Sequence, residues 1–210
     1  TYNEAETIPS LIKELFEKLK QLVEKLDVLI IDDSSPDGTA DIARKLGNDY
    51  EKITVIQRPK KMGLGAAYKE GFRHVLENLD SELIVQMDAD HSHQPSEIPN
   101  MLEQIKNFDF LVASRHVEGS DIIGWGIGRK ATHSIAGAIA SACAKIEIKD
   151  STSGFRMFKK KTLERVNFGK IRSDGFAFQI EVLHQLKQLG MKGLEVPTIF
   201  INRTKGDSKM

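Results

Sequence analysis

The sequence contains a single cysteine, and it lacks both a long apolar run and an excess of charge of either sign. Cys143 alone cannot form an internal disulfide, so disulfide-stabilised scaffolds are excluded and a reducing compartment is favoured. No stretch of about 18 apolar residues is present, so no transmembrane helix is expected within this sequence, and no signal peptide is recognisable. Because the sequence begins at Thr1 without a methionine, we expect it to be a piece of a longer chain.

The charges of the chain balance. Lysine and arginine together number 30, as do aspartate and glutamate, so the formal net charge is zero. Non-specific binding of nucleic acid depends on a strongly basic surface, so nucleic acid is not expected as a partner. With 210 residues, of which 40% are hydrophobic, the chain is long enough for one globular domain with its own core.

Apolar segments alternate with helical patterns along most of the chain. Helices are expected at residues 7–26, 39–46, 65–78, 95–107 and 175–190, and strands at residues 28–33, 53–57, 82–88, 110–115 and 193–203. This alternation predicts the α/β class, with a mostly parallel central sheet flanked by helices. In such sheets ligands bind at the carboxyl ends of the strands.

The segment 116–146 departs from this alternation. Residues 116–128 are rich in glycine and predict a mobile loop, which the glycines would allow to close over a substrate; a plain surface loop is the alternative. Residues 135–146 are too short to span a bilayer but apolar enough for a helix in the membrane interface, where Trp125 would also be suited to lie. Ordinary packing of this helix on the sheet is the alternative.

The expected strand 82–88 ends in Asp88, and a second carboxylate, Asp90, lies two residues further on. Like charges repel each other unless a cation or a shared proton compensates. Carboxylate oxygens suit Mg²⁺ or Mn²⁺, which bridge one or two carboxylates to substrate phosphates. We therefore predict a divalent metal site that a diphosphate completes; a solvated turn with helix-capping aspartates is the alternative. A zinc site with His91 and His93 is not favoured, because a cluster on one loop rarely closes a tetrahedral site.

Basic residues and glycines form a second candidate element in residues 58–72, RPKKMGLGAAYKEGF. Arg58 and Lys61 precede Gly63 and Gly65, which open the expected helix. Helix N-termini and glycine-rich loops favour anions. The alternative is a solvated basic turn, because the full dinucleotide-binding and P-loop patterns are absent.

Nine motifs together resemble the polyprenyl-phosphate branch of glycosyltransferase family 2, and within it the dolichyl-phosphate mannose synthases. They are TYNEAETIP, IIDDSSPDGTADIA, RPKKMGLGAAYKEGF, QMDADHSHQPSEIP, ASRHVEGS, WGIGRKATHS, DSTSGFRMF, GFAFQIEVL and EVPTIFINRTKGDSKM. The resemblance implies a Rossmann-like GT-A fold, with residues 1–210 as a single catalytic domain that lacks the family's usual first strand. It implies inverting transfer of mannose from GDP-mannose to dolichyl (polyprenyl) phosphate, as part of protein glycosylation.

The resemblance also implies a cellular setting and a cofactor. The enzyme would require Mg²⁺ or Mn²⁺ and would act on a membrane surface. The site of action would be the cytoplasmic face, at the endoplasmic reticulum in a eukaryote or at the plasma membrane in an archaeon. Whether a membrane-anchoring subunit is a further partner is left open.

Residue roles are implied by the same motif matches. Asp88 and Asp90 would hold the metal, and Arg115 and Arg129 the acceptor phosphate. The nucleotide-sugar would contact Tyr2, Asn3, Glu4, Asp33, Arg58, Lys61, Gly63, Asp88, Ala89 and Asp90. The implied catalytic residues are Asp90, Arg115, Arg129, Gln179 at the sugar end, and Arg203 near the diphosphate.

The sequence departs from relatives at two places. Ser92 stands where some relatives have a metal-binding glutamine, although others carry serine there. His133 stands where relatives often have a serine that follows the second arginine, and Ser134 is next to it. Which of His133 and Ser134 meets the acceptor phosphate is open at this point.

The chemistry of such an acceptor matches the residues at hand. A phosphate monoester has a second pKa of about 6 and is mostly a dianion at neutral pH, so it needs no general base. The FQIE stretch accordingly offers no paired acid, and Glu181 is interpreted as structural. Two alternatives remain. One is a UDP-glucose-dependent polyprenyl-phosphate glucosyltransferase. The other is a non-catalytic nucleotide-sugar-binding subunit, and the evidence against it is the presence of Asp88, Asp90, Arg115 and Arg129.

Overall fold

A computed structural model describes residues 1–50, 52–126, 128, 147–175 and 177–203. The helices are α1 (Ile8–Leu19), α2 (Thr39–Leu46), α3 (Leu64–Asn78), α4 (Ile98–Gln104), α6 (Lys160–Leu163) and α7 (Ala177–Gln188). The strands are β1 (Val28–Asp32), β2 (Ile53–Gln57), β3 (Leu83–Gln86), β4 (Phe110–Ser114), β5 (Asp121–Ile123), β6 (Arg156–Lys159), β7 (Gly193–Pro197) and β8 (Ile199–Ile201). Short 3₁₀ turns occupy Pro95–Glu97, Ile105–Asn107 and Phe168–Lys170.

The described strands form three groups. The largest is a four-stranded sheet in the order β3-β6-β4-β7, and β1-β2 and β5-β8 are parallel pairs. β6 runs antiparallel to both β3 and β4, whereas β4 and β7 are parallel. The expectation of a mostly parallel sheet is therefore wrong for β6. Phe155, which directly precedes β6, accepts from the amide of Ala113 near the carboxyl end of β4. β6 therefore begins beside the end of β4 and runs back along it.

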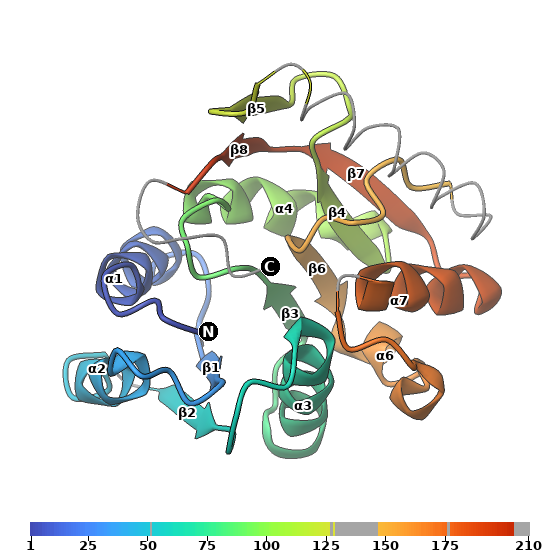
Figure 1. The fold of residues 1–210 in the computed structure, drawn as a ribbon. Coiled ribbons are helices and arrows are strands. Elements are labelled where there is room, and N and C mark those ends of the chain that lie inside the picture. The colour runs from blue at the N-terminus through green and yellow to red at the C-terminus, as the bar shows by residue number, and fades with distance from the viewer. Residues whose placement is uncertain (51, 127, 129–146, 176, 204–210) are drawn as a thin grey trace.

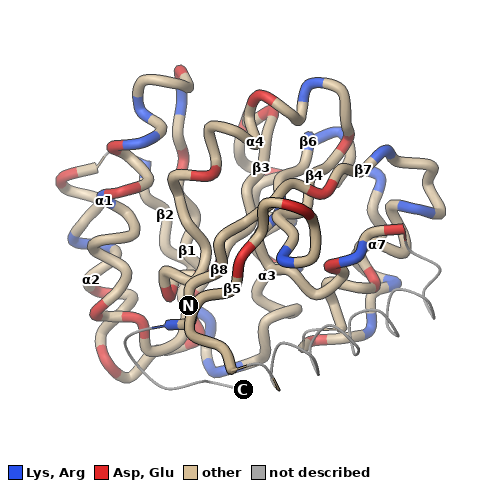
Figure 2. The backbone as a smooth tube through the Cα atoms, turned by 90° about the horizontal axis from the view of Figure 1, so that it is seen from above, with Lys and Arg blue, Asp and Glu red and all other residues tan. Residues whose placement is uncertain are grey.

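Both faces of the four-stranded sheet are covered, as the alternation along β4 shows. Phe110 and Val112 pack with residues of α3 and α7, whereas Leu111 and Ala113 pack with residues of α1 and α4. Successive side chains of a strand point to opposite faces, so these are the two sides of one layer. Figure 1 shows α1 and α4 on one side of the row of strands and α3, α6 and α7 on the other. Acidic and basic residues are interspersed along the described chain (Figure 2).

Two expected elements differ in extent from their sequence pattern. The helix predicted for residues 7–26 ends at Leu19, and Leu22, the next member of its apolar stripe, is 56% exposed. The single strand predicted for residues 193–203 is divided at Thr198 into β7 and β8. The amide of Thr198 bonds to the last carbonyl of β4, and Glu97 accepts bonds from the Thr198 hydroxyl and the Ile199 amide.

The segment expected to be a mobile loop contains a strand. β5, at residues 121–123, pairs in parallel with β8 over its full length. The apolar pair within it supplies the buried side chain of Ile122. The interfacial helix expected at residues 135–146 lies outside the described residues. Among the helices that are described, none has the length and apolar content to cross a membrane.

Thr1 lies beside the end of β1. Its amino group donates to the carbonyl of Ile31, and its carbonyl accepts from the amide of Asp33 at 3.0 Å, which is the pattern of a parallel ladder. Within the described part of the chain, β1 and β3 are not joined by a ladder. The absence of a first strand stays a prediction.

Candidate active site

The predicted metal loop and Arg115 lie at one edge of the sheet. β3 and β4 are both antiparallel to β6, so they point the same way, and Asp88 and Arg115 each follow one of these strands. β8 contacts both the metal loop and Arg115 through Phe200. The ring of Phe200 lies 6.0 Å from the ring of His93 in the metal loop, and 5.3 Å from the guanidinium carbon of Arg115.

Asp88 is held by neighbours that carry no charge. The hydroxyl of Tyr68, on α3, donates to its Oδ1 at 3.2 Å, and the Asp88 amide donates to Nδ1 of His93 at 3.0 Å. Burial and the charge of Asp88 raise the pKa of Tyr68, so its hydroxyl keeps its proton and remains a donor. A Cβ at Gly154 would lie 3.3 and 3.4 Å from the two carboxylate oxygens, so a side chain there would crowd the group.

Asp90 is a buried and ionised carboxylate. Its Oδ1 accepts from the amide and the hydroxyl of Ser92, and its Oδ2 lies 2.8 Å from Nη2 of Arg203. Burial acts to raise its pKa, but the bonds from Ser92 and the charge of Arg203 outweigh burial and lower it. Ser92 therefore stabilises the ionised form of Asp90 by direct hydrogen bonds. Arg203, expected near the diphosphate, here neutralises a metal-site carboxylate.

The donor set fits a hard divalent cation that is shared with a ligand. Among the described residues, no group of three or more histidine, cysteine, aspartate or glutamate side chains could hold a metal ion by itself. Both histidines of the loop are engaged, His91 with the hydroxyl of Ser10 at 2.8 Å and His93 with the Asp88 amide. Mg²⁺ and Mn²⁺ suit one or two carboxylates supplemented by phosphate oxygens, so Asp88 and Asp90 fit such an ion.

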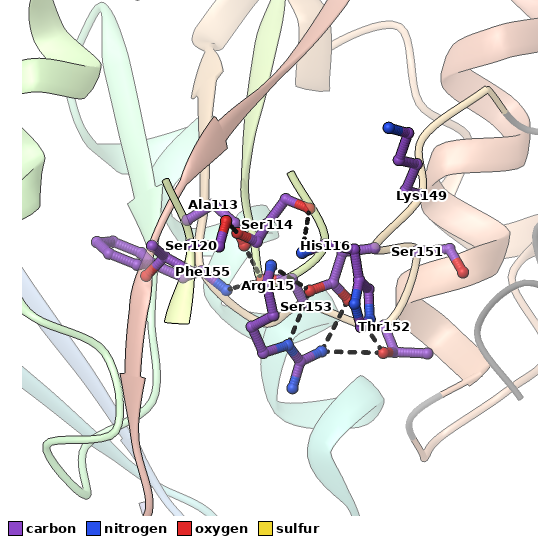
Figure 3. Close-up of polar contacts among 12 residues, drawn as sticks. Ala113, Ser114, Arg115, His116, Ser120, Lys149, Ser151, Thr152, Ser153 and Phe155 are labelled. Carbon is purple, nitrogen blue, oxygen red and sulfur yellow. Dashed lines mark hydrogen bonds and ion pairs between the residues drawn. The ribbon is translucent and has the colours of Figure 1, made fainter. Parts of the chain in front are cut away.

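Arg115 forms a two-pronged ion pair with a residue that the sequence had not singled out. Its Nε and Nη2 lie 2.7 Å from the two carboxylate oxygens of Asp150, and its amide donates to the same carboxylate at 2.9 Å (Figure 3). Although burial acts to raise it, the bonds and charge of Arg115 lower the pKa of Asp150 to about 2. The carboxyl group of Asp150 is thus ionised throughout the physiological pH range.

The expected nucleotide residues at the N-terminus are tied to the loop after β1. The amides of Asn3, Glu4 and Ala5 donate to the side chains of Ser35, Thr39 and Asp37, at 3.0, 2.9 and 3.0 Å respectively. These bonds fix the backbone of the YNE stretch. The ammonium of Lys61 lies 4.6 Å from the ring centre of Tyr2, so these two predicted residues lie together.

Asp33 and Arg58, both expected near the nucleotide, form a buried pair. Nε and Nη2 of Arg58 bond to Oδ1 of Asp33, and Nη2 also donates to the carbonyl of Gly63 at 3.0 Å. Oδ2 of Asp33 accepts from the amide of Met62 at 3.1 Å. The pair therefore fixes the 58–63 loop, and contact of either residue with a nucleotide stays a prediction.

Gly63 and Gly65 of the 58–72 segment pack closely against the 173–174 loop. A Cβ at Gly63 would lie 2.5 Å from the carbonyl oxygen of Asp174, and one at Gly65 would lie 2.8 Å from that of Ser173. The amide of Gly65 already donates to the Asp174 carbonyl at 2.8 Å. Interpretation of this helix N-terminus as an anion site is wrong for Gly65; the placement of Gly63 near a nucleotide stays a prediction.

Comparison with known proteins identifies the family. Residues 1–166 match the model of Glycosyl transferase family 2. The chain belongs to this family. The undecaprenyl-phosphate mannosyltransferase of Micrococcus luteus is 36% identical over 210 residues, which cover 100% of this chain and 84% of that protein. The polyprenol monophosphomannose synthase of Mycolicibacterium smegmatis is 34% identical over 212 residues, covering 100% and 78%.

Solved structures of low sequence identity share the fold of this glycosyltransferase. The mannosyltransferase PcManGT of Pyrobaculum calidifontis, in complex with GDP-Man and Mn²⁺, has a TM-score of 0.68 at 17% identity, over 99% of this chain and 56% of that one. Glucosyl-3-phosphoglycerate synthase of Mycobacterium tuberculosis, in complex with Mn²⁺, UDP and phosphoglyceric acid, has a TM-score of 0.70 at 17% identity, over 99% and 69%. The predicted GT-A fold is confirmed.

Three residues of the glycosyltransferase's predicted acceptor and catalytic sets, Arg129, His133 and Ser134, lie outside the described residues. Gln179, expected at the sugar end, is described and fully buried on α7, where its carbonyl accepts from Nη1 of Arg156 at 2.9 Å. Arg156 is also fully buried, and burial lowers its pKa to about 9. The sugar-side role of Gln179 stays a prediction.

Sequence reasoning missed the residues that support the charged groups. Asp150 and Gly154 lie in the motif DSTSGFRMF, and Tyr68 lies in RPKKMGLGAAYKEGF. Both motifs carried the family resemblance, but none of these three residues was given a role. The one available signal was Asp150 itself, an acid that opens a motif otherwise poor in charge.

Proposed function

We propose that this glycosyltransferase transfers mannose from GDP-mannose to a polyprenyl phosphate, giving polyprenyl phosphate mannose with inversion at the anomeric carbon. The observation that carries the proposal is the single edge that holds both the Asp88–Asp90 loop and Arg115, joined through Phe200. It is supported by the two relatives at 34–36% identity, whose names specify mannosyl transfer to undecaprenyl phosphate and polyprenol monophosphomannose synthesis.

Residues of this chain would offset the negative charges that the reaction brings together. Two anions, the acceptor phosphate and the departing diphosphate, must meet at one sugar carbon, and the acceptor dianion needs no base. Arg115 offsets the charge of the acceptor. A divalent ion bound at Asp88 and Asp90 would neutralise the charge that develops on the leaving diphosphate. Nη2 of Arg203 lies 2.8 Å from Oδ2 of Asp90. When the donor binds, Arg203 would leave this carboxylate and bind oxygens of the diphosphate.

The finer identity of both substrates belongs to the proposal. We favour GDP-mannose as donor, and a dolichyl or another polyprenyl phosphate as acceptor, since the relatives' names cover undecaprenyl and polyprenol lipids. The lipid acceptor places the reaction at a membrane surface. We assign the reaction to the cytoplasmic face, at the endoplasmic reticulum or the plasma membrane according to the organism, with or without an anchoring subunit.

The test is transfer of radiolabelled sugar into a lipid-extractable product. GDP-mannose and UDP-glucose are each supplied with undecaprenyl or dolichyl phosphate and Mn²⁺. We expect label only from GDP-mannose, and we expect Asp90→Ala to lower the rate by at least about 10²–10³-fold, the loss typical of one preorganised electrostatic contact. Label from UDP-glucose alone would replace the mannose assignment with the glucosyl one. No lipid product from either donor would contradict the proposal.

A further inference from the structure

We infer that Asp150 is a positioning residue for Arg115, which it holds so that Nη1 is the guanidinium nitrogen presented to the acceptor phosphate. The inference rests on the proposed function, in which Arg115 meets that phosphate. It assigns to Asp150 a role in the acceptor half of the reaction and specifies which edge of the arginine is available.

The hydrogen-bond inventory of Arg115 selects Nη1. Nε donates to Oδ2 of Asp150 at 2.7 Å, and Nη2 donates both to Oδ1 of Asp150 at 2.7 Å and to the hydroxyl of Thr152 at 3.1 Å. These bonds use three of the five guanidinium N–H groups. Figure 3 shows the third nitrogen, Nη1, pointing away from both partners. The Nε–Nη2 edge of the guanidinium is therefore occupied by Asp150 and Thr152.

Burial shows which member of the pair faces outward. The side chain of Asp150 is 0% exposed and that of Arg115 is 9% exposed. A carboxylate buried this deeply is costly unless it is paired and hydrogen-bonded, and Arg115 supplies three of its bonds, counting the backbone amide. The aspartate is thus the inner anchor, and the arginine is the member of the pair that a ligand can reach.

The anchor is itself fixed to the sheet. The two carboxylate oxygens of Glu195, on β7, accept from the backbone amides of Lys149 and Asp150, each at 2.9 Å. Glu195 is paired with Val112 of β4, whose strand ends one residue before Arg115. The loop that carries Asp150 and the strand that carries Arg115 are therefore held to each other from both sides.

An aromatic ring also contacts the Arg115 guanidinium. Phe200 lies 5.3 Å from the guanidinium carbon, and its ring also packs against Trp125 at 5.4 Å and His93 at 6.0 Å. An arginine fixed by a carboxylate and a ring loses little freedom when the phosphate arrives. Such preorganisation lowers the cost of binding and of reaching the transition state.

The test separates positioning from mere stabilisation by a double-mutant cycle. Initial rates are measured with GDP-mannose, Mn²⁺ and undecaprenyl phosphate for the wild type, Asp150→Asn, Arg115→Lys and the double variant. We expect Asp150→Asn to raise KM for the lipid phosphate by about tenfold, the scale of a lost supporting contact, with KM for GDP-mannose unchanged. In the Arg115→Lys background the same substitution should change the acceptor KM by less than about twofold, because its effect passes through Arg115.

Two further variants keep the result interpretable. Thr152→Val removes the 3.1 Å contact to Nη2 of Arg115 and the 3.3 Å bond from the Thr152 hydroxyl to Oδ1 of Asp150, but it keeps the bonds between Arg115 and Asp150. It should shift the acceptor KM in the same direction by about two- to threefold, even if Asp150→Asn folds poorly. Asp41→Asn removes an exposed partner of Arg44 on α2 and should change neither KM.

The outcomes distinguish this inference from the function on which it rests. With an active wild type, equal shifts in both KM values, an unchanged acceptor KM in both Asp150→Asn and Thr152→Val, or an undiminished effect in the Arg115→Lys background would overturn the positioning role alone. Absence of lipid product from the wild type would overturn the proposed function, and the role of Asp150 with it.

Discussion

Two buried arginine–aspartate pairs occupy the two halves of this enzyme, and they face opposite ways. In the pair after β1 and β2, the side chain of Arg58 is 1% exposed and that of Asp33 is 9% exposed. In the pair after β4, the side chain of Arg115 is 9% exposed and that of Asp150 is 0% exposed. The more exposed member is therefore the Asp33 carboxylate in the first pair and the Arg115 guanidinium in the second.

The remaining contacts of each pair explain the difference. Arg58 bonds onward to the carbonyl of Gly63, and Asp33 to the amide of Met62, so the first pair holds a loop. Asp150 is fixed from behind through Glu195, so the second pair holds an arginine. A carboxylate that faces outward can accept hydrogen bonds from the base of a nucleotide, and a guanidinium that faces outward can donate to a phosphate. Three substitutions or conditions test this contrast, and a fourth substitution tests the uncharged support of Asp88.

The largest effect is expected at the first pair and should appear as lost stability. Arg58→Met leaves the buried Asp33 without its partner, so the free energy of unfolding should fall by about 3–5 kcal/mol, measured by urea denaturation. The matched control is Arg44→Met at an exposed pair on α2, where a change within about 1 kcal/mol is expected. Equal losses in the two variants would show that the Arg58 pair does not support the fold.

The corresponding change at the second pair should appear in catalysis. Arg115→Lys keeps a positive charge beside Asp150 but loses the planar group. We expect mannosyl transfer to fall by about 100-fold, equivalent to about 2.7 kcal/mol, with the melting temperature nearly unchanged. A loss of stability as large as that of Arg58→Met, with normal transfer, would make the two pairs alike and refute the contrast.

Acid should weaken the second pair in a defined pH window. The pKa of Asp150 is lowered from 3.8 to about 2, so its contribution to stability is complete above about pH 4 and is lost as the pH falls through about 2. A depression of this size corresponds to about 2 kcal/mol. The stability difference between the wild type and Asp150→Asn, measured by denaturation across this window, should shrink as the pH falls. A constant difference would contradict the lowered pKa.

The smallest effect concerns the neutral support of the metal loop. Tyr68→Phe removes the hydroxyl that donates to Asp88 but keeps the ring, which stacks near Phe72 and Phe178. One such bond contributes about 1 kcal/mol, so affinity for Mn²⁺ in the presence of GDP should fall by about fivefold in a thermal-shift titration. Tyr50→Phe, whose ring stacks on Phe16, is the control. Equal affinities in all three proteins would remove Tyr68 from the metal site.

Local patterns predicted most of the α/β scaffold. α2 and β2 begin and end where the sequence predicts. α2 is bounded by Gly38 and Gly47, and β2 is a short apolar pattern of its own. The pairing of strands was less predictable. The antiparallel β6 and the β5–β8 pair depend on contacts between segments far apart in the chain, and residues 116–128 and 193–203 carry no local signal for their pairing.

For the site, the sequence predicted the charged groups at the ends of strands and missed the residues that support them. Asp88, Asp90 and Arg115 end or follow apolar strands, and strand ends are where parallel sheets bind ligands. Asp150 lies in a loop without a periodic pattern, and its role follows only from the 2.7 Å contacts to Arg115. The packing role of Gly65 likewise depends on the distant 173–174 loop.

The most direct test of the central claim, that Asp88 and Asp90 hold a divalent ion that binds the nucleotide, is thermal unfolding with GDP in the presence and absence of Mn²⁺. The wild type should be stabilised by GDP only when Mn²⁺ is present, and Asp90→Asn should lose this stabilisation while it unfolds as cooperatively as the wild type. Stabilisation by GDP that is the same without metal, or that is kept in Asp90→Asn, would contradict the account.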